Sequence, residues 1–337
     1  MRLMLNEPGM FLGVRRGLLV VYRKGEKLAE IPPPQIEQVM VTTRGASISS
    51  AAVTLLSMHN VDLIFYSRKG YPVSRLVSMR SGAVKLRRAQ YALRDTERGG
   101  ELARAFVLGK LFNQRTVLQR AVKSKMRSSP STALFLKSKA DEIKEVIDEV
   151  WSLEPRPCEE MRKPLMLLEA RAGEAYWEGF SALVPEELGF ESRKKRFERP
   201  KDPVNVMLNY CYGLLAGQVL LSLEKTGLDV YAGFLHKDSP RRPALVMDLM
   251  EEFRQPIVDK VVLKLAQGLE EDILEGERLK REARLKLAKA LSERMSEKVT
   301  FSNRCTKLEY HILLQARRLA EYVAGREKVY EPFTERA

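Results

Sequence analysis

The first 80 or so residues contain short apolar runs that are rich in β-branched and aromatic side chains. Such runs, bounded by Gly, Pro and charged residues, are typical of half-buried β-strands. One segment, SSAAVTLLSMHN, differs because its serines can cap a helix and its apolar residues recur at helical spacing. The pattern predicts strands at residues 17–23, 27–32, 35–43, 61–67 and 72–78.

From about residue 83 onward, apolar positions recur three and four residues apart, which is the period of an amphipathic helix. The segment 204–227 is long, mostly apolar and ends at Gly227, so we expect it to be a core helix. Two more helices are predicted within 270–325. Helix breaks are predicted where Pro and Ser gather, at 128–132, 155–157 and 193–203.

The change of period predicts an α+β fold with two domains. We expect a small N-terminal β-sandwich-like domain over residues 1–82 and a larger, all-α catalytic domain over 101–337. A basic linker and helix start at 83–100 would join them. A chain of 337 residues is long enough to bury two cores.

Basic residues outnumber acidic ones, and the formal net charge is +14. Much of this charge lies in residues 68–127, which hold 16 Lys and Arg against only Asp95, Glu97 and Glu101. A strongly basic segment favours a polyanionic partner. We interpret it as a nucleic-acid contact, in preference to a solubility patch or a contact with an anionic membrane.

The cysteines are Cys158, Cys211 and Cys305, which are far apart and form no CxxC pair. This spacing argues against a zinc knuckle or a disulfide framework and favours buried free thiols in a reducing cytosol. The N-terminal MRLMLNEPGMF lacks the apolar core of a signal peptide, and the apolar run 213–223 is shorter than a bilayer requires. We therefore expect a cytoplasmic protein with no membrane contact.

Residues 231–259 contain the side chains best suited to bind a metal ion. His236 shortly precedes a predicted helix on which Asp248 and Glu251 are three residues apart, and therefore on one face. Upstream, Glu169 lies in the apolar helical pattern LLEARAGEAYWEGF. An imidazole and carboxylates that converge can bind Mg²⁺ or Mn²⁺. The alternative interpretation is a solvated acidic helix start and a histidine with a structural role.

Acidic residues in a basic, DNA-binding protein would repel the ligand unless a cation lay between them. A divalent cation can also polarise a phosphoryl oxygen and lower the pKa of an attacking hydroxyl group. Basic side chains would hold the phosphates and supply affinity with little sequence preference. Our candidates for DNA contact are Arg87, Arg88, Arg193, Lys194, Lys195, Arg196, Arg199, Arg241 and Arg242.

Several acids and histidines leave alternatives open. Glu174 lies in the same predicted helix as Glu169, and spacing alone does not choose between them. Asp238 could be a ligand or simply an acid of its turn. We interpret His59 as a helix-end residue and His311 as a helix-surface or core residue. The chain has no P-loop, GxGxxG, GxSxG or HExxH pattern, so nucleotide hydrolysis, dinucleotide binding and serine or zincin hydrolysis are unsupported.

Five segments, in order and over nearly the full length, resemble the spacer-acquisition integrases of CRISPR–Cas adaptive immunity. They are PPPQIEQVMVTTRGASISSAAVTLLSMHNVDLIFYSRKG, LLEARAGEAYW, RPKDPVNVMLNYCYGLL, GFLHKDSPRRPALVMDLMEEFRQPIVD and YEPFTERA. The DPVN segment and the block from His236 to DLMEEFR are the most specific of these. LLEARAG departs from the more usual Gly-rich approach to the first family acid.

This resemblance implies a metal-dependent DNA integrase and nuclease with an N-terminal β-sandwich and a helical C-terminal domain. It also implies a homodimer that works on double-stranded and branched DNA with a small ferredoxin-like partner. The family's Mg²⁺ or Mn²⁺ ligands correspond to Glu169, His236 and Glu251, and we expect Asp248 to support them or to bind a second ion. The implied reaction is transesterification by a DNA 3′-OH. The competing functions are a non-catalytic nucleic-acid scaffold and an RNA-processing nuclease.

Overall fold

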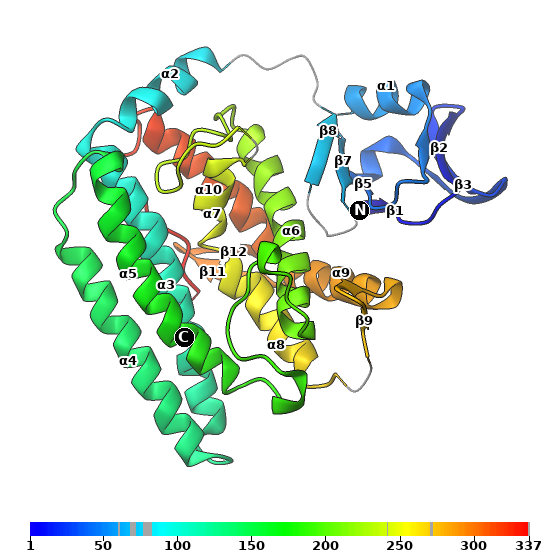
Figure 1. Cartoon of the computed structure of the whole chain (residues 1–337). Helices are drawn as coiled ribbons and strands as arrows, with labels where there is room; N and C mark the ends of the chain where they lie inside the picture. Colours follow the sequence, from blue (N-terminus) through cyan, green and yellow to red (C-terminus); the bar gives the residue numbers. More distant parts are fainter. Residues whose placement is uncertain (60, 68–71, 77–82, 241, 270–271, 336–337) are drawn as a thin grey trace. The chain divides into compact units, whose positions relative to one another are not determined.

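The computed structural model describes the chain apart from residues 60, 68–71, 77–82, 241, 270–271 and 336–337. The chain divides into two compact units, Met1–Gly82 and Ala83–Ala337. The first unit is rich in strands and the second is helical (Figure 1), which confirms the predicted α+β class.

The strand-rich unit contains two four-stranded sheets. Its elements are β1 (Arg2–Leu5), β2 (Met10–Arg15), β3 (Leu18–Arg23), β4 (Glu26–Ile31), η1 (Pro33–Gln35), β5 (Gln38–Val41), β6 (Ser47–Ile48), α1 (Ser50–Met58), β7 (Asp62–Tyr66) and β8 (Pro72–Leu76). One sheet has the order β1-β5-β7-β8, in which only the β7–β8 pair is antiparallel. The other has the order β4-β3-β2-β6, with antiparallel pairs except for a short parallel β2–β6 pair.

The core of this unit is formed by strand residues and by one face of α1. Ser49 caps α1 by accepting a hydrogen bond from the N–H of Ala52 at 3.1 Å, and α1 buries Ala52 and Leu56 in the core. His59 follows as the last, capping residue of the helix, as interpreted from the sequence. The predicted strands overlap with β3, β4, β5, β7 and β8, and residues 77–78 of the last predicted strand lie outside the described residues. The pattern missed β1, β2 and β6, because β1 has only four residues, β6 has only two, and Gly13 interrupts the apolar run of β2.

The helical unit begins with α2 (Val84–Leu93) and α3 (Glu97–Lys125). A turn at 94–96 separates them, and Thr96 caps α3 through the N–H of Gly99. The segment 83–100, which we expected to be a linker and helix start, is therefore one short helix and the first residues of the next. α3 packs against α4 (Pro130–Ser152) and α5 (Cys158–Ser181), and the three run side by side (Figure 1).

The apolar helix predicted at 204–227 is α6 (Pro203–Glu224), with Asp202 as its N-cap. Within the part of the chain that the structure describes, α6 alone is long and apolar enough to cross a membrane. The prediction from 213–223 that this segment is too short was therefore wrong. However, 83% of its most apolar window is buried inside the unit, as in the central helix of a core. α6 packs against α7 (Ala244–Met250) and α10 (Leu308–Val323).

The rest of the unit combines short helical segments with two hairpins. The hairpins, β9–β10 and β11–β12, are additions to the all-α pattern that we predicted, because strands of two to four residues carry no detectable period. Two cysteines, Cys158 and Cys211, are buried, whereas Cys305 is exposed on β12, so its predicted burial was wrong. The remaining elements are η2 (Glu186–Leu188), η3 (Arg196–Glu198), the π-helical η4 (Arg254–Asp259), α8 (Lys260–Ala266), β9 (Leu274–Glu275), β10 (Arg278–Leu279), α9 (Arg281–Ser296), β11 (Lys298–Phe301) and β12 (Arg304–Lys307).

Candidate metal centre

Two of the predicted ligands, Glu169 of α5 and Glu251 at the end of α7, meet at the ammonium group of Lys110 on α3. Lys110 donates a hydrogen bond to Oε1 of Glu169, and its Nζ lies 3.0 Å from Oε2 of Glu251. The side chain of Glu251 is only 3% exposed. Burial lowers the pKa of Lys110, but Glu169 and Glu251 outweigh it and the pKa is raised. The lysine therefore stays charged between the two carboxylates.

Glu251 is held in its ionised form by the surrounding positive charge. The Nε of Arg254 donates to its Oε1 at 2.9 Å, and the guanidinium lies over the ring of Tyr212, 4.6 Å from the centroid. Burial by itself raises the pKa of Glu251, but Arg254, Lys110 and His236 together lower it to about 2.

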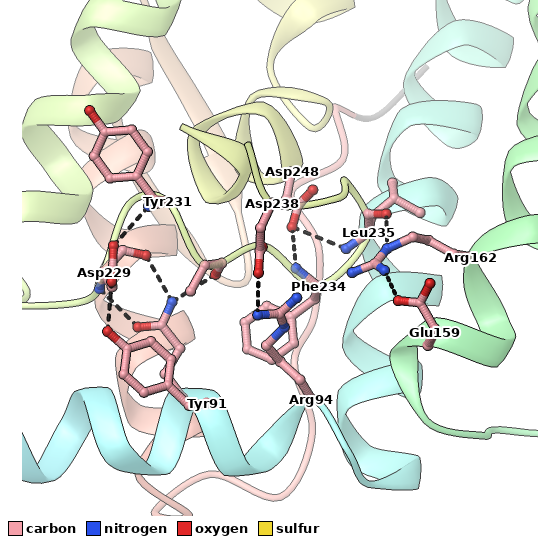
Figure 2. Close-up of polar contacts among 12 residues, drawn as sticks. Tyr91, Arg94, Glu159, Arg162, Asp229, Tyr231, Phe234, Leu235, Asp238 and Asp248 are labelled. Atoms are coloured by element: carbon pink, nitrogen blue, oxygen red, sulfur yellow. Dashed lines mark hydrogen bonds and ion pairs between the residues drawn. The ribbon is translucent and has the colours of Figure 1, made fainter. Parts of the chain in front are cut away.

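Asp248 is fully buried and organises the loop that carries His236 (Figure 2). Its Oδ2 accepts hydrogen bonds from the N–H groups of Phe234, at 2.6 Å, and Leu235, at 3.1 Å. Its Oδ1 accepts the N–H of His236 at 2.8 Å and lies 2.8 Å from Nδ1 of the same residue. A carboxylate only accepts, so the ring donates from Nδ1, and in the neutral ring Nε2 carries the lone pair. Asp248 thus orients the imidazole for a ligand at Nε2.

The same loop is clamped by α2, which lies below it in Figure 2. Gln90, which is fully buried, donates to the carbonyl groups of Asp229, at 2.9 Å, and Ala232, at 2.8 Å. It also accepts the N–H of Asp229 at 2.8 Å. The hydroxyl of Tyr91 donates to Oδ2 of Asp229 at 2.6 Å. Because Gln90 binds only backbone groups of the loop, it fixes the approach of the chain to His236.

We expect Gln90→Leu to lower the free energy of unfolding by about 3 kcal/mol, because three backbone groups would lose their partners at about 1 kcal/mol each. Urea denaturation measures this loss. Lys85→Ala, at an exposed position of the same helix, is the control and should change stability by less than about 0.5 kcal/mol. Equal midpoints for Gln90→Leu and the wild type would show that α2 does not hold the loop.

The two alternatives left open by the sequence lie elsewhere. Glu174 is exposed on α5, whereas Glu169 is partly buried and faces Lys110, so the geometry favours Glu169. Asp238 is 49% exposed and pairs with Arg94 at 2.7 Å on the α2 side of the loop. Its carboxylate is therefore used to hold the turn.

The basic residues predicted to contact DNA differ in their surroundings. Arg87 is exposed, but its Nε donates to the carbonyl of Gly227 at 3.0 Å, and Lys194 lies 3.9 Å from Glu191. Arg241 and the side chain of Arg196 lie outside the described residues. The other exposed candidates are Arg88, Lys195, Arg199 and Arg242.

Arg193 is bound inside the helical unit. Its guanidinium donates to Oδ1 of Asn205, at 3.0 Å, and of Asn209, at 2.7 Å, on α6. It also lies over the rings of Trp177 and Tyr212. These contacts attach the basic loop to the core, which is a structural role in addition to the DNA contact predicted for this residue.

Part of the charge of the segment 68–127 is used inside the protein, and Arg68, Lys69 and Arg80 of this segment lie outside the described residues. α3 is a core helix, so its long basic side chains reach carboxylates and carbonyl oxygens of neighbouring elements. Seven basic residues of α2, α3 and the turn between them make such contacts: Arg87, Arg94, Arg98, Arg104, Lys110, Arg115 and Arg120. The net charge of the segment therefore overstated the surface available to a polyanion.

The donor chemistry of the site fits a divalent cation. Two carboxylates and an imidazole nitrogen are ligands that Mg²⁺ and Mn²⁺ accept. Although Oε2 of Glu251 lies near Lys110, it is buried and accepts no well-directed hydrogen bond from the described residues. Among those residues, no three His, Cys, Asp or Glu side chains are close enough together to form a ready-made metal cluster. The ammonium group of Lys110 stands between the two carboxylates.

Comparisons with known proteins identify a family that the sequence matches. A sequence model of the family described as CRISPR associated protein Cas1 matches residues 3–293. The CRISPR-associated endonuclease Cas1 1 of Archaeoglobus fulgidus is 36% identical over 100% of both chains, and that of Thermus thermophilus is 32% identical over 99% of both.

Solved structures show the same architecture. A casposase bound to an integration product superposes with a TM-score of 0.81 at 25% identity, over 98% of this chain and 92% of that one. A Cas1 protein from Thermotoga maritima superposes with a TM-score of 0.76 at 21% identity, over 98% and 99% of the two chains. The family match and the full-length relatives confirm the resemblance seen in the sequence: the chain belongs to the Cas1 family of CRISPR-associated proteins.

Proposed function

We propose that this chain is a divalent-cation-dependent DNA nuclease and integrase of CRISPR adaptation, which joins captured DNA fragments to CRISPR repeats. Its full-length relatives are named endonucleases, and the casposase that it resembles was solved with an integration product. The observation that carries the proposal is the convergence of Glu169 and Glu251 on one ammonium group. A second observation supports it, since Asp248 orients the imidazole of His236.

Each residue of the site has a separate task in this proposal. Glu169, Glu251 and Nε2 of His236 would hold the cation, which supplies polarisation of a phosphoryl oxygen and activation of a hydroxyl group. Asp248 keeps the imidazole in one orientation, and Arg254 keeps Glu251 ionised. A DNA 3′-OH that attacks a phosphodiester of the CRISPR repeat forms a new phosphodiester and releases the old one's leaving oxygen as a hydroxyl group, which is transesterification. Water that attacks a phosphodiester in the same way cleaves the strand.

The proposal extends to partners. We infer from the family resemblance that the chain acts in the cytoplasm as a homodimer, on double-stranded and branched DNA, with a small ferredoxin-like subunit. The solved Cas6-RT-Cas1--Cas2 complex contains the same fold, with a TM-score of 0.79 at 21% identity over 100% of this chain and 36% of that one. That complex motivates a search for a Cas2-type partner of this chain.

Strand transfer tests the function directly. A labelled short DNA duplex with free 3′-OH ends should become joined to a plasmid that contains CRISPR repeats, in Mn²⁺ and not in EDTA. The same duplex with dideoxy ends is the matched control and should not be joined, because the attacking hydroxyl is missing. The reaction should be run with and without the small partner subunit.

Two results would contradict the proposal. Preferential cleavage of single-stranded RNA would favour an RNA-processing nuclease. Binding of DNA with neither cleavage nor joining, in Mn²⁺ and in Mg²⁺, would favour a non-catalytic scaffold in which the acids form structural ion pairs.

A further inference from the structure

Lys110 is a buried cation whose ammonium group contacts the two carboxylates of the candidate metal centre. It bonds Glu169 and lies 3.0 Å from Glu251, and its side chain is only 16% exposed. The position of the charge is notable because it lies between two groups that the proposed function assigns to a divalent cation. The inference below therefore rests on the proposed metal site.

The other charges near the centre have their own partners. Asp248 accepts three backbone N–H groups and the imidazole, and Oε1 of Glu251 accepts the Nε of Arg254. Lys110 is thus the cation that bridges Glu169 to Glu251 in this structure. Without it, the two carboxylates would repel each other in a poorly solvated environment.

A divalent cation at the same two carboxylates would repel the ammonium group. Like charges a few ångströms apart interact unfavourably inside a protein, because the effective dielectric constant is well below that of water. The ammonium and the divalent cation would also compete for the same lone pairs. Oε2 of Glu251, near Lys110 but without a well-directed hydrogen bond, is an acceptor that the lysine only partly satisfies.

We propose that Lys110 is a built-in counter-ion, which holds Glu169 and Glu251 together before the metal ion arrives and is exchanged for it. In this role Lys110 stabilises the metal-free protein and weakens metal binding. Any free energy that Lys110 contributes only to the metal-free form is subtracted from the binding of the cation, because the two equilibria are linked.

The test is the stability and Mn²⁺ affinity of Lys110→Met, with Mn²⁺ alone as the probe. We expect Tm in EDTA to fall by about 3 °C and Mn²⁺ to bind about tenfold more tightly, since both changes report the same free energy. At saturating Mn²⁺ the difference in Tm from the wild type should disappear. Calorimetry measures Tm, and electron paramagnetic resonance of free Mn²⁺ measures the affinity. If the methionine variant does not fold in EDTA, Lys110→Gln gives the same comparison.

Lys260→Met is the matched control. Lys260 is also a partly buried lysine in an ion pair, but its partner is Glu335. This variant should lose the same stability in EDTA and in Mn²⁺, and its Mn²⁺ affinity should not change.

Two outcomes for Lys110→Met would overturn the inference. A stability loss that persists at saturating Mn²⁺, with unchanged affinity, would make Lys110 a structural residue like Lys260. Weaker Mn²⁺ binding would mean that Lys110 helps to form the metal site. A failure of the proposed function looks different, because Glu251→Gln would then bind Mn²⁺ as tightly as the wild type, or the wild type would not bind Mn²⁺.

Discussion

Glu251→Gln should abolish DNA cleavage and strand transfer at every Mn²⁺ concentration. The amide has the shape of the carboxylate but no charge, so the site loses an anionic ligand. The ammonium of Lys110 and the guanidinium of Arg254 also lose the anion they share. We expect the rate to fall by about a thousandfold, since a metal ion contributes several kcal/mol to such a reaction. The measurement is the initial rate of joining over a range of Mn²⁺ concentrations.

Glu169→Gln should be inactive for the same reason, and Glu174→Gln is its matched control, because Glu174 is an exposed acid of the same helix. DNA binding should remain nearly normal in all three variants, since affinity depends on the basic residues. Recovery of Glu251→Gln at high Mn²⁺, or an inactive Glu174→Gln beside an active Glu169→Gln, would show that the ligands are assigned wrongly.

Asp248→Asn should have a smaller effect on the chemistry and a larger one on folding. Each carboxylate oxygen of Asp248 receives two donors. If the amide NH₂ replaces Oδ2, the N–H groups of Phe234 and Leu235 lose their acceptor. If it replaces Oδ1, the backbone N–H of His236 loses its acceptor, and the ring can accept from the amide only by moving its proton from Nδ1 to Nε2. We expect the free energy of unfolding to fall by about 2 kcal/mol and the activity by roughly 10–100-fold, because the imidazole is no longer held in one orientation.

Part of the lost activity of Asp248→Asn should return at high Mn²⁺, since the ligands themselves are intact. A titration of activity against Mn²⁺ therefore distinguishes this variant from Glu251→Gln. If Asp248→Asn stays inactive at all Mn²⁺ concentrations while Glu251→Gln recovers, the roles of the two acids are reversed. Unfolding in urea, measured in parallel, separates a loss of orientation from a loss of structure.

The two-unit fold could be predicted from sequence because hydrophobic period is a local property. Strands such as β3 and β7 and the long helix α6 were found because their own residues determine the pattern. The short hairpins and the break between α2 and α3 were not predicted, because segments of two to four residues contain too few positions to show a hydrophobic period.

The candidate ligands were also readable, since Asp248 and Glu251 share a helix face and the motifs resemble a known family. The resemblance also led us to expect that Asp248 supports the ligands, but the sequence did not show which contacts would give it that role. Asp248 accepts backbone N–H groups of the loop before His236, and those contacts depend on how the loop folds back onto α7. Spacing also left Glu169 and Glu174 as equal candidates. The packing of α5 against α3 distinguishes them, because it turns Glu169 toward Lys110 and leaves Glu174 exposed.

Charge was the property that sequence represented least well. The composition determined that the chain is basic and that much of the charge lies in 68–127. Only the tertiary structure decided that Lys110, Arg104 and Arg120 bind groups inside the protein. The physical reason is that a hydrophobic pattern depends on near neighbours along one element. The partner of a long basic side chain, in contrast, is whichever acceptor the folded chain brings within a few ångströms, however distant it is in sequence.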